Sequence, residues 1–141
     1  MTADSPWFER CDNPEAVRAL YDSGEGLDRV RLVELRLGQH DPHLWLRVEL
    51  PRFPDRPPAR WHPEATVAQA TVAFWFVEEV RLEGWSGDAE GTLSLVRADG
   101  GLRMAFESGA MRLAARCLGA RVDGFGAHAV WPPDDAGGGI A

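Results

Sequence analysis

The residues best suited to metal chemistry lie in one short segment, residues 40–43 (HDPH), which holds two imidazoles and a carboxylate. A transition metal accepts these ligand types. A zinc site also needs a third or fourth ligand and supporting hydrogen bonds. His62 and His128 are the other imidazoles in the chain, and neither belongs to the same segment. We therefore interpret the pair as solvated loop histidines and predict no bound metal.

Two further patterns match known motifs only in part. Residues 124–129 (GFGAHA) fit G-x-G-x-x-A, which binds dinucleotides between a strand and a helix, but Trp131, Pro132 and Pro133 follow almost at once. Residues 84–88 (GWSGD) end in aspartate where a nucleophile elbow requires glycine. We interpret the first pattern as accidental and the second as a turn, and we predict no cofactor.

The composition removes several catalytic mechanisms. All 15 basic residues are arginine, so no lysine can form a Schiff base or hold a phosphate in a Walker-type loop. Cys11 and Cys117 lie far apart in sequence, and no local motif gives either of them a histidine and an orienting carboxylate. We expect two reduced, partly buried thiols and predict no catalytic residue.

The densest group of carboxylates lies between residues 78 and 90. Neighbouring residues of a strand point to opposite faces, so the adjacent Glu78 and Glu79 make a poor acid–base pair. Either this group is a solvated face, or it is a surface for a basic partner, because acidic patches speed association with basic proteins. The candidate partner-binding residues in this group are Glu78, Glu79, Glu83, Asp88 and Glu90.

A proline-rich segment, residues 51–63, cannot form regular structure, because proline removes backbone donors and keeps the preceding residue extended. We predict a stiff connection that crosses from one sheet edge to another. The same segment could anchor a partner, since tryptophan and arginine dominate interface hot spots. The candidate partner-binding residues here are Asp55, Arg56, Arg60 and Trp61.

The elements that would position these groups are mostly strands. A helix of about ten residues is expected after Asn13 as N-cap and Pro14 as the first helical residue, ending near Gly24. Alternating apolar residues then predict a run of antiparallel strands, with a bulge near Leu32 and an Asp-Gly hairpin turn at residues 98–101. The expected strands cover about 28–37, 44–50, 66–77, 80–85, 93–95, 102–106, 111–117 and 120–125.

We predict a mainly β (α+β) fold: an antiparallel meander curled or folded into a sandwich, with one N-terminal helix packed on it. Residues 1–130 would form a single domain and residues 131–141 a disordered tail. Trp45 and Trp75 fall on the polar parity of their strands, so they either carry a second layer or form an exposed patch.

Charge and hydropathy exclude further classes. The formal net charge of −7 argues against nucleic-acid binding. Neither a membrane-spanning run nor a secretory signal is present, so we expect a cytoplasmic protein. Arginine in place of lysine, with few Ile and Asn residues, is typical of a GC-rich bacterial genome.

Several structural motifs resemble the immunity protein 50 family: residues 13–14 (NP), 33–35 (VEL), 50–61 (LPRFPDRPPARW) and 82–85 (LEGW). The resemblance runs from about residue 7 to residue 125. Proteins of this family are small, mostly β, occur in GC-rich actinobacteria and are associated with polymorphic toxin systems.

The resemblance implies a non-enzymatic protein that binds and neutralises a cognate bacterial toxin, and it supplies no catalytic residues. An acidic inhibitor would complement a basic toxin surface. The alternative from the residues alone is a small soluble β-rich binding or scaffold module with an unknown ligand.

Overall fold

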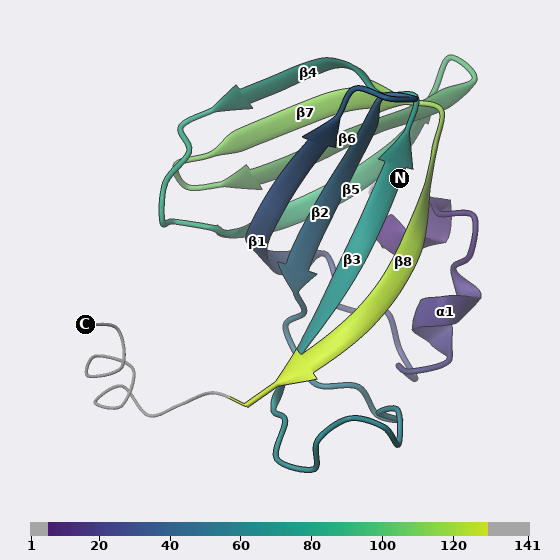
Figure 1. Ribbon diagram of the computed structural model, residues 1–141, viewed down its shortest axis with the longest axis vertical. Coiled ribbons are helices and arrows are strands. Elements are labelled where there is room, and N and C mark those ends of the chain that lie inside the picture. Colours follow the sequence, from purple (N-terminus) through teal and green to yellow (C-terminus); the bar gives the residue numbers. More distant parts are fainter. Residues whose placement is uncertain (1–5, 130–141) are drawn as a thin grey trace.

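The computed structural model describes residues 6–129, and one antiparallel sheet dominates it (Figure 1). The sheet has eight strands in the order β4-β7-β6-β5-β1-β2-β3-β8. The strands are β1 (Arg29–Gly38), β2 (His43–Glu49), β3 (Val67–Trp75), β4 (Glu78–Glu83), β5 (Glu90–Ala98), β6 (Gly101–Ser108), β7 (Arg112–Cys117) and β8 (Gly119–His128). The predicted antiparallel, mainly β fold is confirmed.

The sheet curls because its two halves are joined over a short stretch. β1 pairs with β5 only through Arg29–Arg31, and beyond this point the two strands diverge. The half β1-β2-β3-β8 therefore lies across the half β4-β7-β6-β5 (Figure 1). β6 and β8 are not neighbours in the sheet order but contact each other, which shows that the inner face closes on itself.

Alternation along the strands builds the core between the two halves. In β2 every second residue is buried, and in β5 and β6 the leucines, Met104 and Phe106 alternate with exposed or half-buried residues. None of the buried residues in the described part of the chain is polar or charged. Burial of these apolar side chains is the main force that holds the two halves together.

Two local predictions about the strands are also confirmed. The register of β1 against β2 shifts between Leu32 and Glu34, which places a bulge where the sequence indicated one. Asp99 and Gly100 both have positive φ, 48° and 82°, as a two-residue hairpin between β5 and β6 requires.

The expected ten-residue helix is wrong in length. The structure has a 3₁₀ turn, η2 (Trp7–Arg10), followed by a single helical turn, α1 (Glu15–Arg18). Arg56 donates hydrogen bonds to the backbone carbonyls of Arg18 and Ala19, which closes the C-terminal end of α1. These long-range contacts, which sequence periodicity does not contain, end the helix earlier than Gly24.

Asn13 is not the helix cap that the sequence indicated. Its side-chain Nδ2 donates to the carbonyl of Val122 and its Oδ1 accepts from the N–H of Val122, both at 2.9 Å. Next to it, the N–H of Asp12 donates to the carbonyl of Ala120 at 2.8 Å. The segment therefore covers part of the free edge of β8 in the way that another strand would.

Replacing Asn13 by alanine is expected to lower the free energy of unfolding by about 2–3 kcal/mol, because both partly buried backbone groups of Val122 lose their partner. Urea denaturation of the purified variant measures this. Asp12→Ala is the matched control, since Asp12 bonds through its backbone, and it should change stability by less than about 0.5 kcal/mol. Equal effects of the two substitutions would contradict the role given to the Asn13 amide.

The two cysteines are free and buried in the core. Burial raises the pKa of the Cys11 thiol to about 12 and that of Cys117 to about 11. Thiolate is the reactive species, so we expect neither cysteine of the folded protein to react at pH 8 with a chromogenic thiol reagent. Both should react promptly in denaturant, and rapid labelling of the native protein would contradict this assignment.

Candidate partner-binding site

The proline-rich segment joins β2 to β3, which are neighbouring antiparallel strands, so the predicted crossing from one sheet edge to another is wrong. The whole connection, residues 50–66 and here called the crossover, is tied to the N-terminal segment by two arginines. Arg52 donates to the carbonyls of Ser23 and Glu25 and lies over the ring of Tyr21, 5.2 Å from its centroid. The Tyr21 hydroxyl donates back to the carbonyl of Arg52 at 2.8 Å. Burial raises the pKa of Tyr21, so this hydroxyl keeps the proton that it donates. The crossover is therefore held to the domain, as a structural connection needs.

Arg56 has the same structural role. Besides its bonds to the end of α1, it forms an ion pair with Asp22, and the N–H of Asp22 donates to the Asp55 carboxylate at 2.8 Å. Arg56 and Asp55, two of the sequence-predicted partner residues, are thus engaged by their own chain. Trp61 is half-buried and packs edge-on against Phe53 with ring centroids 5.6 Å apart, while Arg60 is exposed.

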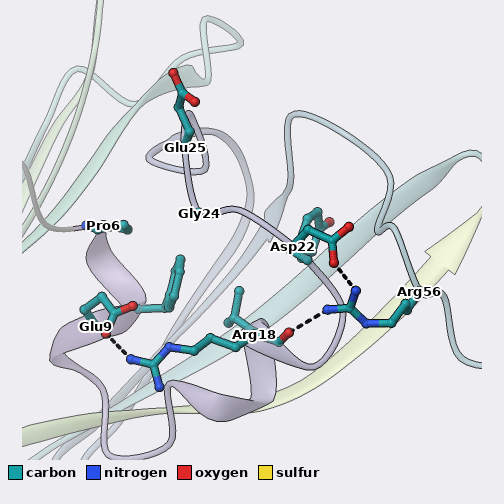
Figure 2. Close-up of a pocket in the computed structure, with 10 residues that line it drawn as sticks. Pro6, Glu9, Arg18, Asp22, Gly24, Glu25 and Arg56 are labelled. Atoms are coloured by element: carbon teal, nitrogen blue, oxygen red, sulfur yellow. Dashed lines mark hydrogen bonds and ion pairs between the residues drawn. The ribbon is translucent and has the colours of Figure 1, made fainter.

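A cleft with a volume of about 550 Å³ lies between this crossover and the N-terminal segment (Figure 2). Its wall carries Glu9, Arg18, Asp22, Glu25 and Arg56. Figure 2 shows both arginines committed to partners within the cleft, Arg18 to Glu9 and Arg56 to Asp22. Sites for small molecules are mostly apolar with a few convergent polar groups, so this self-paired wall lacks their usual character.

The acidic group lies on β4, in the loop after it and at the first residue of β5. Glu79 has a positive φ of 58° and lies in a bulge of β4 against β7. The Glu79 carboxylate lies 3.7 Å from Arg116, and Glu90 at the start of β5 lies 3.9 Å from Arg29. The other carboxylates of the group, those of Glu78, Glu83 and Asp88, are exposed and form no ion pair within residues 6–129.

The two predicted groups do not meet. β4 forms one end of the molecule in Figure 1, whereas the crossover loops out beyond the opposite ends of β2 and β3. The two groups therefore cannot form one compact patch. β4 is the edge strand of the sheet, and every one of its residues is exposed.

Exposed apolar residues beside the acidic group are the feature that sequence reasoning missed. Val80 and Leu82 on β4 remain 37% and 41% exposed, and Trp85 just after β4 is 57% exposed. In sequence, Val80 and Leu82 alternate with charged residues like those of any half-buried strand. Their exposure follows from the edge position of β4, which the sequence does not contain.

Trp45 and Trp75 are half-buried on the outer face of the sheet. The Trp45 ring stacks on His43 with centroids 5.3 Å apart, and the Arg36 guanidinium lies 5.1 Å from its centroid. Trp75 lies across Gly119, where an added Cβ would come within 2.3 Å of the ring. Each tryptophan is thus held flat on the surface of the sheet and is neither fully covered nor free.

The remaining motifs have local explanations. The His40 side chain is fully exposed, with Asp41 at 3.8 Å, and residues 6–129 contain no group of three His, Cys, Asp or Glu that could hold a metal. Residues 124–128 lie inside β8, which is not the strand-to-helix turn of a dinucleotide site. No helix in the described part of the chain is both long and apolar enough to cross a membrane.

Comparison with known proteins supplies the remaining observation. No curated protein and no solved structure matches the chain significantly. The family model described as immunity protein 50 matches residues 13–128, which include all eight strands and both predicted groups. This agrees with the resemblance that the sequence motifs indicated. Since the match covers most of the chain, the protein belongs to the immunity protein 50 family.

Proposed function

We propose that this protein is an immunity protein of a polymorphic toxin system, which binds a cognate toxin and neutralises it without catalysis. Membership of the immunity protein 50 family is the observation that carries the proposal. In the cleft between the crossover and the N-terminal segment, the arginines pair with carboxylates of the same wall, which agrees with inhibition by occlusion more than with a small-molecule site.

We place the protein in the cytoplasm, where thiols such as Cys11 and Cys117 stay reduced. The acidic group at β4 is the better of the two predicted contact surfaces. Arg56 and Asp55 of the crossover bond within the domain, whereas Glu78, Glu83 and Asp88 are exposed and form no ion pair in the described chain. The net charge of −7 favours a basic toxin surface, so the affinity should fall as salt rises.

The test is co-expression with the toxin domain encoded beside this gene. Cells that make the toxin should survive only when they also make this protein, and the two proteins should co-purify. An empty vector and a matched expression level serve as controls. Equal killing with and without the protein would refute the proposal. Glu83→Gln should weaken binding more than Arg56→Gln does if the acidic group is the contact surface.

A further inference from the structure

The outer edge of β4 carries no strand partner among residues 6–129. β4 pairs with β7 on one side only, and it is the first strand in the sheet order. At the other end of the sheet, the edge of β8 is partly covered by Asp12 and Asn13. An uncovered edge presents a row of unpaired N–H and C=O groups, which is a template for another strand.

The register identifies which backbone groups are open. The N–H of Ser108 donates to the carbonyl of Met111 at 2.9 Å, so these residues form the hydrogen-bonded pair that closes the β6–β7 hairpin. Hydrogen-bonded and non-hydrogen-bonded pairs alternate along an antiparallel ladder, so Leu113, two residues after Met111, also bonds to β6. The backbone N–H and C=O groups of its two neighbours on β7 therefore point toward β4. Leu82 lies opposite Leu113, so the N–H and C=O of Leu82 point away from β7.

The side chains at this edge favour one kind of occupant. Leu82 lies opposite the buried Leu113, so it shares the inner face with the core, yet 41% of it is exposed. Val80, also exposed, would extend the same apolar strip. Glu78 and Glu83 stand at the two ends of β4 and form no ion pair within residues 6–129.

We propose that the edge of β4 binds an extended, positively charged segment of the toxin as an additional strand of the sheet. Backbone bonds to Leu82 would align the segment, and its apolar side chains would pack on Val80 and Leu82. Its arginines or lysines would lie near Glu78 and Glu83. Trp85, beside the end of β4, is 57% exposed and would cover the bound strand. The inference rests on the proposed function and names its contact.

The first test uses the toxin domain encoded beside this gene and hydrogen exchange of the full chain. The Leu82 amide should exchange rapidly in the free protein and become protected in the complex. Protection in the free protein that grows with concentration would assign the edge to a second copy and overturn the inference. A complex in which this amide stays unprotected would overturn it too. Absence of any complex would instead contradict the proposed function.

Substitutions at Leu82 distinguish the contribution of its backbone N–H to toxin binding from that of its side chain. Leu82→Pro removes the outward N–H without removing a bond to β7, and proline is tolerated at such edge positions. It should weaken toxin binding by about tenfold or more relative to Leu82→Ala, which loses the same packing but keeps the N–H. Equal affinities of the two variants would overturn the backbone contact. If Leu82→Pro fails to fold, hydrogen exchange of the Leu82 amide in the unaltered protein still tests whether a strand binds at this edge.

A charge test uses Glu78→Gln with Glu83→Gln and compares them with Glu64→Gln, an exposed glutamate on the distant crossover. The double variant should bind the toxin domain several-fold more weakly at low salt and show a flatter salt dependence. Glu64→Gln should match the unaltered protein. If all variants bind alike, the segment that occupies the edge is not selected by charge, and the proposed chemistry of the partner is wrong.

Discussion

Gly91→Ala is expected to destabilise the protein by about 3 kcal/mol or more, a large fraction of the roughly 5–15 kcal/mol by which a typical domain is stable. A Cβ at residue 91 would lie 2.0 Å from the carbonyl oxygen of Glu107 on the neighbouring strand. That oxygen belongs to the backbone and cannot move without breaking the β5–β6 ladder. Residue 91 also lies where β5 pairs with β1, at the place where the sheet curls.

Gly126→Ala is the matched control for this substitution. It also adds one methyl group to a strand glycine, but a Cβ there meets no atom within 4 Å. Its free energy of unfolding should stay within about 1 kcal/mol of the unaltered protein, with a slight gain expected from the stiffer unfolded chain. Urea denaturation of the two variants side by side measures the difference, and similar midpoints would show that the strand at residue 91 yields more easily than its contacts indicate.

Trp7→Ala is the second large effect, and we expect it to cost about 3–5 kcal/mol of stability. Only 1% of the Trp7 side chain is exposed, and its indole Nε1 donates to the carbonyl of Leu27 at 3.0 Å. The ring also packs edge-on against Phe8, with centroids 5.8 Å apart. The substitution would leave both a cavity in the core and a buried carbonyl without its donor.

The matched control is Trp85→Ala, because Trp85 is exposed and should contribute less than about 0.5 kcal/mol. Both variants are compared by chemical denaturation with the same probe. If Trp85→Ala lowered the free energy of unfolding as much as Trp7→Ala, the Trp85 ring would have to pack against the domain in solution. Trp7 lies outside the residues matched by the family model, so this pair also tests whether the upstream segment belongs to the folded core.

The strands were predictable because their signal is local. Alternation in β2 and the Asp-Gly turn between β5 and β6 follow directly from residue types, as does the bulge near Leu32. The sequence predicts too long a helix and indicates the wrong partner for the Asn13 side chain. Both errors come from contacts with residues distant in sequence, Arg56 in one case and Val122 in the other.

The candidate site was predictable only in part, for the same reason. The sequence indicates that residues 78–90 are acidic, and the structure places these residues on and beside an edge strand. Whether Leu82 is buried or exposed depends on the strand order, because a neighbour on the open side of β4 would cover it. Arg56 is a second example. From the sequence it is a candidate interface anchor, but in the structure its side chain bonds to Arg18, Ala19 and Asp22 of its own chain.

The contact between the N-terminal segment at Asn13 and β8 determines when a newly made chain can complete its fold. Asn13 bonds to Val122 across 109 residues, and β8 completes the side of the sheet that β3 leaves open. Until the ribosome has released β8, both the edge of β3 and the segment at Asn13 lack their partners. Such non-local pairings form slowly compared with helices. Synthesis of β8, the last strand among residues 6–129, therefore sets the earliest moment at which this sheet can be completed.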